Sequence, residues 1–359
     1  MYILLAILLL AILIVVHEWG HFVAARLMKI EVTEFSVGFG PKIIGWNSRK
    51  HETKFSVRLI PLGGYCAFFG EDDASGETKD DPRAYPKQNV WKRMFVTVMG
   101  PMMNFVLAFV VGTAFFWIWG NVVPVQPEQI DPYISEVMAA GPAKSAGLQA
   151  GDIVTEVNGK NMLDGTVDTL LGTIASWQEG DGPLQMTVKR GEETVQVAVT
   201  PVKDESDGKM RIGVYIGGYV RTKTVPVGFL GGFRESFAMC VDAGGAILRA
   251  LKNLVTTGEG LDQTSGPVGI VSLVSSQVQA YGASAFVQLL ILISINLGLM
   301  NLLPIPGLDG SRLVFCLIEV VRRKPVPPQK EAVVHLVGMV FLFGLMIFFT
   351  YKDIIRLFQ

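Results

Sequence analysis

The chain has 359 residues, of which 50% are hydrophobic and 18% are charged, and its formal net charge is -1. A soluble chain of this length normally carries about a quarter charged residues, so the composition, with a mean hydropathy of +0.41, indicates an integral membrane protein. The small net charge gives no reason to expect a nucleic acid partner. Three cysteines in unrelated contexts suggest neither a disulfide framework nor a thiolate zinc site.

The first predicted element is an apolar helix over about residues 2–25, and it carries His17, Glu18 and His21 in the pattern HExxH. Two imidazoles four positions apart lie on one helix face, and the carboxylate beside the first can reach a water held between them. This is the arrangement of zinc hydrolases. A charged side chain at the centre of a membrane helix costs about 2.5 to 3.5 kcal/mol, so polar groups placed there are expected to have a function.

Two other interpretations of this helix compete with a zinc site. A short pattern arises by chance, and a histidine in an apolar helix is commonly a satisfied core residue. Residues 1–25 are also the right length for a cleaved signal peptide, but they lack a basic start and a small-residue cleavage site before the motif. Cleavage after the motif would remove the only HExxH in the chain. The zinc interpretation is therefore favoured over both.

Three further segments are long and apolar enough to span a membrane, at about 94–119, 285–303 and 333–351. Basic residues in the loops predict the orientation by the positive-inside rule, which places the loop after the first span and the loop after the third in the cytoplasm. Both termini and residues 120–284 are then outside. Lys352 and Arg356 oppose this assignment only weakly. The residues that favour it are Arg26, Lys29, Lys92, Arg93, Arg322, Arg323, Lys324 and Lys330.

A small sheet or hairpin is predicted between the first two spans, because residues 54–59 alternate polar and apolar at period two and residues 33–37 do so more weakly. Residues 60–65, which include Gly63 and Gly64, are expected to turn the chain. The hairpin is either a packing element or an open edge that holds a substrate in extended form by strand addition. The acidic stretch 71–83 is expected to be a mobile surface loop.

The second span contains Gly100 and Pro101, followed by Asn104. Glycine and proline here are consistent with ordinary close packing of helices in lipid. Asn104 faces the same way as Gly100, so it can instead hydrogen-bond a substrate backbone or the polar groups of the site. Both interpretations remain open from the sequence.

Residues from about 124 to 216 carry charges and strand-like runs. Residues 145–159 resemble the AGLxxGDxIxxVNG signature of PDZ domains, and residues 184–190 with 193–200 are predicted to form a hairpin. Ile212, Gly213 and Val214 resemble the strand that borders the peptide groove in that domain family. Such a groove binds extended chains by edge pairing. The alternative is a domain that only blocks access to the membrane part.

Residues 229–255 repeat apolar side chains at helical spacing but contain too many charges to span, so a helix on the outer membrane face is predicted. Residues 258–269 are rich in turn formers. The predicted fold is a polytopic α-helical membrane protein with four spans, a membrane-associated β-hairpin and an extracytoplasmic α+β PDZ domain. The predicted domains are 1–119 with the first two spans, 120–220 with the PDZ domain, 221–284 with the interfacial helix and a linker, and 285–359 with the last two spans.

A zinc site needs a third protein ligand, with a fourth position left for water. The remaining histidines are poor candidates, because His51 lies in a polar stretch and His335 begins the last span. Asp309 is a better one, since two prolines break the third span just before it and non-helical backbone at this depth is tolerated only inside protein or beside a wet cavity. It falls at the same cytoplasmic end as His17 and His21. The alternatives are an N-cap of a helix over 311–321, or a pair with Arg312.

Taken together, HEWGH in the first span, the PDZ-like insert and NLLPIPGLDG at the end of the third resemble the site-2 protease family of intramembrane zinc metalloproteases, in particular its bacterial RseP type. The resemblance covers nearly the whole chain. It implies one Zn²⁺ held by His17, His21 and Asp309, with Glu18 as general base. It also implies that Asn301 and Asn296 contact the substrate chain and that residues 61–65 belong to a membrane-dipping hairpin.

Two departures from that type are visible. Enzymes of the RseP type often carry two tandem PDZ domains, whereas this chain has room for one, and Ser311 follows the LDG sequence where a second glycine is frequent. The resemblance implies hydrolysis of peptide bonds in single-span membrane proteins, such as anti-sigma factors or remnant signal peptides, in the bacterial inner membrane. The rival functions are a membrane-bound PDZ receptor with a vestigial metal site and a metal transporter. A transporter would need polar residues lining several spans, and the fourth offers little beyond His335.

Overall fold

The computed structural model divides the chain into two compact units, residues 1–119 with 226–359 and residues 120–225, called here the helical unit and the inserted unit. His51 and most of the predicted surface loop 71–83 lie outside the described residues. The described residues are 2–48, 53–71, 78, 81–124, 130–138, 141–163, 167–178, 180–204, 208–220, 222–258, 260 and 265–357.

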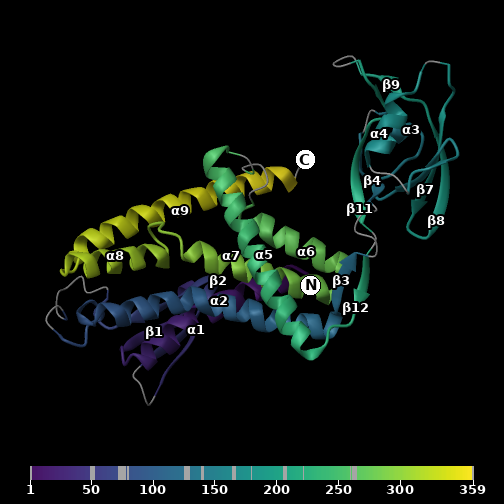
Figure 1. Ribbon diagram of the computed structural model, residues 1–359. Helices are drawn as coiled ribbons and strands as arrows, with labels where there is room; N and C mark the ends of the chain where they lie inside the picture. The colour runs from purple at the N-terminus through teal and green to yellow at the C-terminus, as the bar shows by residue number, and fades with distance from the viewer. Residues whose placement is uncertain are drawn as a thin grey trace. The chain divides into compact units, whose positions relative to one another are not determined.

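Four helices among the described residues are long and apolar enough to cross a membrane: α1, α2, α7 and residues 329–355 of α9. They coincide with the four predicted spans, because long apolar runs are the strongest helical signal in a membrane protein. Figure 1 shows α1, α2 and α7 lying alongside one another, with α5 crossing them. The helices of this unit are α1 (Tyr2–Leu27), α2 (Val90–Trp119), α5 (Phe229–Thr256), α6 (Pro267–Tyr281), α7 (Ala283–Asn301), α8 (Asp309–Arg322) and α9 (Pro328–Leu357), with a 3₁₀ turn at Tyr85–Lys87.

Glycines bring the three central helices close together. A Cβ at Gly20 of α1 would collide with the Met99 carbonyl of α2, and one at Gly298 of α7 would lie 3.0 Å from the Pro101 carbonyl. Small residues at helix crossings let backbones approach in lipid, where packing rather than water exclusion drives association. The polar side chains that these helices carry are therefore brought into one place.

Helix α6 occupies the segment that the sequence analysis left as a linker. Val274 and Val278 of α6 are buried against Leu9 and Leu13 of α1. Its start is marked by Gly266 and by a proline in its first turn, which is a good helix opening as well as a turn signal. Because Gly266 and the proline are also typical of a turn, the sequence did not predict this helix, which packs against α1.

Helix α5 packs on α2 and α7 through one face and does not lie free of them. Met239, Cys240, Ala243 and Ile247 contact the cluster built by Ala108 and Ile291. The Ser236 hydroxyl, fully buried, donates to the Phe109 carbonyl at 2.8 Å. The opposite face keeps large apolar side chains exposed, such as Phe237 and Val241, which suits an amphipathic helix at the lipid boundary.

Strands β1 (Val32–Asn47) and β2 (Lys54–Phe68) form the predicted sheet, but both are longer than predicted. The expected turn over residues 60–65 lies within β2: residues 54–57 run parallel to residues 34–37 and residues 64–68 run antiparallel to them, so the chain reverses direction between 57 and 64. Gly63 takes part in this turn with a φ of +133°, which is accessible to glycine. Arg58 ties the sheet together by donating to Glu34, Ser36 and Tyr65. In order across the sheet, the paired segments are 64–68, 32–37, 54–57 and 44–47.

The inserted unit is an α+β fold with its own apolar core, which includes Ile134, Val154, Val157 and Leu170. Its main sheet has the order β11-β4-β5-β7-β8, and β7 with β8 is the predicted hairpin. The unit continues to Val225, because β12 pairs with β3. Its elements are β3 (Asn121–Pro124), β4 (Ile130–Val137), α3 (Pro142–Ser145), β5 (Ile153–Val157), β6 (Lys160–Asn161), α4 (Val167–Ala175), β7 (Leu184–Arg190), β8 (Glu193–Val199), β9 (Val202–Lys203), β10 (Met210–Arg211), β11 (Val214–Val220) and β12 (Thr222–Val225).

Candidate metal centre

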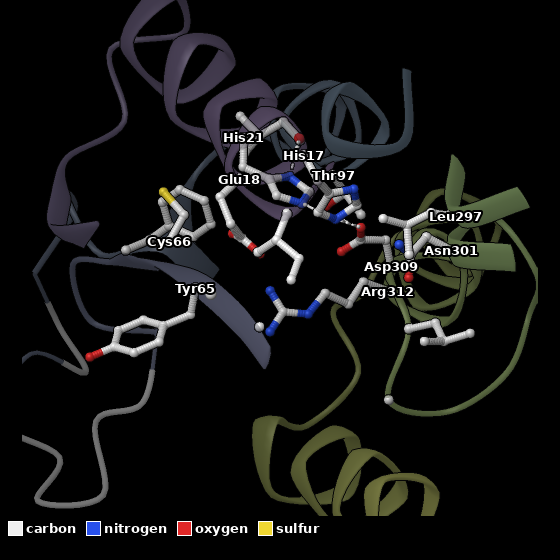
Figure 2. A pocket seen from close by; sticks show the side chains of 17 residues that line it. His17, Glu18, His21, Tyr65, Cys66, Thr97, Leu297, Asn301, Asp309 and Arg312 are labelled. Carbon is white, nitrogen blue, oxygen red and sulfur yellow. Dashed lines mark hydrogen bonds and ion pairs between the residues drawn. The ribbon is translucent and has the colours of Figure 1, made fainter. Parts of the chain in front are cut away.

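Three side chains from two distant parts of the chain converge in the helical unit. His17 and His21 come from α1, and Asp309 is the first residue of α8. The Asp309 Oδ2 atom lies 3.1 Å from His17 Nε2 and 3.3 Å from His21 Nε2, and the two Nε2 atoms are 3.3 Å apart. Figure 2 shows the three polar tips pointing toward one another.

This geometry fits a tetrahedral metal site. Zinc bonds to histidine nitrogen and carboxylate oxygen of 2.0 to 2.2 Å require neighbouring ligand atoms to be about 3.3 to 3.5 Å apart. Asp309 Oδ2 is buried and has no hydrogen-bond partner among the described residues, although both imidazoles face it. With both Nε2 atoms unprotonated, three lone pairs face one another, an arrangement that a cation between them would stabilise. These residues are also the one cluster of metal-ligating side chains found in the described chain.

The second nitrogen of each imidazole is held by α2. His21 Nδ1 lies 2.9 Å from the Val96 carbonyl oxygen, which can only accept, so Nδ1 carries a proton and, in the neutral ring, Nε2 keeps its lone pair. His17 Nδ1 lies 3.2 Å from the amide nitrogen of Asn104. When Nε2 of His17 binds a metal, Nδ1 carries the proton and needs an acceptor. The Asn104 amide oxygen is buried and has no hydrogen-bond partner in the described structure. If the side-chain amide group is rotated by about 180°, its oxygen replaces its nitrogen beside His17 Nδ1 and accepts that proton.

Asn104, which was also predicted to contact the substrate, does not line the cavity in this structure: it is 0% exposed and contacts His17 instead. Of the two interpretations left open, the structure supports a bond to the polar groups of the site. Ser294 of α7 in turn donates to the Asn104 carbonyl at 2.7 Å, which fixes this turn of α2 against α7.

Gly100 has a specific role beside these ligands. A Cβ at this position would collide with His21 Nε2, so only glycine lets the imidazole lie against α2. Gly20 makes the matching close approach from α1. The Gly-Pro pair in α2 is therefore more than a general packing feature.

The position of Asp309 excludes the two structural roles considered for it. The N-cap of α8 is Leu308, and no side chain caps this helix. Arg312 pairs with Glu71, with its Nη1 at 2.6 Å from Oε1. The turn before Asp309 is supported by α9, because the Gly307 N–H donates to His335 Nδ1 at 3.3 Å. His335 thus lies behind the turn and is not a ligand.

A cavity of about 300 Å³ opens beside the three ligands. The Glu18 carboxylate points into it in Figure 2. Gly63, Gly64 and Asn301, which were assigned to the substrate, also line it. Several other lining residues were not predicted from the sequence, among them Ile14, Tyr65, Cys66, Thr97, Leu297 and Arg312. For Arg312 a signal was available, because it lies three positions after Asp309 and so on the same helix face.

Asn296 does not belong to the cavity. It is exposed on α7, and five residues along a helix of 3.6 residues per turn leave it about 140° away from Asn301 around the axis. Both asparagines lie in the same apolar run, so the sequence alone did not distinguish them.

The expected peptide groove of the inserted unit is only partly free. Ile212 is buried, and its carbonyl accepts from the Ala143 N–H at 2.9 Å. The Gly213 carbonyl accepts from the Met138 N–H at 2.9 Å. Val214 begins β11, which lies at the edge of the main sheet. The backbone available for pairing is therefore that of β11, which begins after Ile212 and Gly213.

Comparison with known proteins gives one consistent result. The sequence model of peptidase family M50 matches residues 5–345 of this chain. The regulator of sigma-W protease RasP from Bacillus subtilis is 31% identical, over 96% of this chain and 96% of that protein. The zinc metalloprotease RasP from Oceanobacillus iheyensis is 30% identical, over 98% of each. Among solved structures, the PDZ domain of the SdrC-like protein from Listeria monocytogenes covers 26% of this chain and 93% of its own, with 25% identity and a TM-score of 0.22.

Proposed function

This chain belongs to peptidase family M50, the site-2 proteases, and is a zinc metalloprotease; we propose that it cleaves single-span membrane proteins at the centre formed by His17, Glu18, His21 and Asp309. Anti-sigma factors and remnant signal peptides are the substrate classes proposed. The observation that carries the proposal is the convergence of three potential metal-ligand atoms at 3.1 to 3.3 Å beside a cavity that contains a carboxylate.

The contacts assign three roles to these residues: metal binding, proton transfer and orientation of the imidazoles. His17, His21 and Asp309 would hold one Zn²⁺, which would polarise the scissile carbonyl and lower the pKa of water. Glu18 accepts the proton of the attacking water on its carboxylate and delivers it to the departing amine. Val96 and Asn104 keep the two imidazoles oriented, since a ligand whose far nitrogen is fixed loses no orientational freedom on binding.

Hydrolysis at this centre requires an extended substrate, because the carbonyls of an intact helix are hydrogen-bonded within the helix and are hidden from the site. The segment 64–68 of β2 is at one edge of its sheet, and Gly64 lies against Glu18, as a Cβ there would be 3.1 Å from Glu18 Cγ. We therefore propose that an unwound substrate pairs with this edge, with Asn301 on the α7 side of the cavity.

The orientation proposed for the membrane follows from where the basic residues fall. Arg26 and Lys29 follow the metal-binding half of α1, and Lys92 lies at the start of α2, next to the same site. By the positive-inside rule this end faces the cytoplasm, in a bacterial inner membrane. The inserted unit is then outside, where its edge strand β11 is proposed to act as a PDZ groove for extracytoplasmic peptide segments.

Substitution of the proposed base tests this function. The full chain is reconstituted in lipid with a truncated single-span protein as substrate, and zinc is measured per chain. Wild type is expected to cleave and to hold one zinc, whereas Glu18→Gln keeps the zinc and loses cleavage by at least about 10²- to 10⁴-fold, as removal of a general base implies. Glu136→Gln, an exposed acid of the inserted unit, is the matched control and is expected to cleave normally. Cleavage by Glu18→Gln at the wild-type rate would refute the assigned base.

A further inference from the structure

One charged side chain in the cavity has no role in the reaction described so far. Arg312 of α8 lines the same cavity as Glu18 and Asp309, and Figure 2 shows its guanidinium reaching from the Asp309 side toward the part of the cavity that holds Glu18 and Tyr65. A cation is costly to keep inside a membrane protein, so its position calls for a reason.

Arg312 forms an ion pair with the Glu71 carboxylate, which is itself hydrogen-bonded to the backbone at the end of β2. Its Nη1 donates to Glu71 Oε1 at 2.6 Å. The other oxygen of Glu71 accepts from the Phe68 N–H at 3.3 Å, and the Glu71 N–H donates to the Phe68 carbonyl at 3.2 Å. The guanidinium is therefore fixed relative to the end of β2, whose segment 64–68 is the proposed substrate edge.

The ion pair uses only part of the guanidinium. Arginine offers five N–H donors on three nitrogens, and within the described structure only Nη1 of Arg312 has a partner. The side chain remains 41% exposed, against 15% for Glu71. The remaining donors are therefore accessible from the cavity, while the carboxylate that orients them is enclosed.

An unwound substrate requires such donors. Each peptide carbonyl that leaves a helix inside a membrane protein and finds no donor costs several kcal/mol. A strand edge satisfies only one side of an extended chain, since successive carbonyls point to opposite sides. The other side needs donors from elsewhere, and a guanidinium makes stronger hydrogen bonds to oxygen than a neutral amide does.

We propose that Arg312 is a substrate-binding residue of this centre, whose free guanidinium nitrogens donate to a backbone carbonyl oxygen of the extended substrate while Glu71 holds the guanidinium in place. This inference rests on the proposed function. It differs from a purely structural reading, in which the Arg312–Glu71 pair only ties α8 to β2.

Two substitutions and a chemical rescue separate these readings. Arg312→Ala is expected to lower kcat/KM by about 10- to 100-fold, the range for loss of a hydrogen bond from a charged donor, and to retain one zinc per chain. Glu71→Gln leaves the guanidinium present and is expected to lose less than Arg312→Ala. Millimolar guanidinium ion is expected to restore part of the activity of Arg312→Ala, because a free guanidinium can donate to a carbonyl but cannot join α8 to β2.

The controls use the same helix and the same additive. Arg322→Ala removes an exposed arginine from the last turn of α8 and is expected to behave as wild type, and guanidinium ion is expected to leave Glu18→Gln inactive. Arg312→Lys keeps a cation of similar length and is expected to fall between wild type and Arg312→Ala, which covers the case of an alanine variant that does not fold.

Three results would overturn the inference. These are equal losses in Glu71→Gln and Arg312→Ala without rescue, loss of zinc from Arg312→Ala, or full activity in Arg312→Ala. Failure of wild type to cleave any single-span substrate is a different outcome, because it would refute the proposed function itself.

Discussion

Two buried carboxylates, one in each unit of this chain, differ in how they are satisfied. In the inserted unit, Asp152 is 0% exposed, and both its oxygens are bound by Arg190 at 2.8 and 2.9 Å, with a further N–H from Gln149 at 2.9 Å. In the helical unit, Asp309 Oδ2 is buried beside two imidazole nitrogens and has no hydrogen bond. The first carboxylate is satisfied by its own chain, and the second requires a cation.

The same contrast holds for the other buried polar atoms. All four that lack a partner among the described residues belong to the helical unit, on Arg26, Asn104, Asp309 and His335. Three of these four residues lie at the metal site or directly behind it. An unsatisfied buried polar group costs about 1 to 3 kcal/mol. Several such groups in one place are therefore expected only where the binding of a metal ion or substrate offsets that cost. Incomplete satisfaction therefore marks the functional unit more clearly than burial does.

The largest effect is expected from the carboxylate that the chain leaves unsatisfied. Asp309→Ala removes one of three ligands and is expected to abolish both stable zinc binding and cleavage, measured by metal content and by turnover of a single-span substrate. Asp353→Ala is the matched control, because Asp353 is 4% exposed but already accepts from the Gly269 N–H at 2.7 Å. Retention of zinc by Asp309→Ala would show that the two carboxylates do not differ as described.

Backbone clearance at the metal site is the next test. Gly100→Ala places a methyl group where His21 Nε2 lies, so the imidazole must rotate away and zinc occupancy should fall together with activity. Gly344→Ala in α9 is the control, since a Cβ there meets nothing within 4 Å. The two variants make the same chemical change in apolar helices, so equal zinc content in both would remove the case for a close approach.

A smaller effect is expected behind the ligands. Asn104→Ala deletes the acceptor proposed for His17 Nδ1 and should lower zinc affinity by about 10- to 100-fold, the usual result of removing such a support. The measurement is competition with a chelator of known affinity. Asn296→Ala, an exposed asparagine on α7, is the control, and it should leave both affinity and cleavage unchanged.

Features that depend on local spacing could be predicted from the sequence, whereas contacts between distant helices could not. The HExxH spacing fixes two ligands on one helix face, and the apolar runs of α1, α2, α7 and α9 predict their own helices. Contacts across the site carry no such periodic signal. That Asn104 contacts His17 depends on how α1 and α2 meet, which local spacing does not encode.

Local signals also failed where they pointed in two directions. Gly266 with Pro267 is both a loop signal and a helix start, so α6 was interpreted as linker. Packing of α6 against α1 decides the outcome there. At residues 60–65 the glycines pointed only to a turn, and the chain does reverse direction there, between the segments 54–57 and 64–68 of β2.

The smallest effect on catalysis, and the sharpest test of the contrast, is expected in the inserted unit. Burial alone would raise the pKa of the Asp152 carboxyl, but the hydrogen bonds from Arg190 and from the Gln149 N–H outweigh it and hold that pKa below its usual value. A carboxyl whose pKa is lowered by folding stabilises the fold above its unfolded pKa of about 3.9, and this contribution is lost as the pH falls through the folded pKa.

Asp152→Asn should therefore destabilise the inserted unit by about 1.5 to 3 kcal/mol near neutral pH, as measured by hydrogen exchange of the β5 and β7 amides in the full chain. The difference from wild type should shrink as the pH is lowered below about 4, because the wild-type carboxylate then also becomes protonated. Zinc content should not change, since the helical unit does not use Asp152. A variant that lost zinc as well as stability in the inserted unit would show that buried acids in the two units are coupled, and the contrast between a self-satisfied and a metal-requiring carboxylate would then fail.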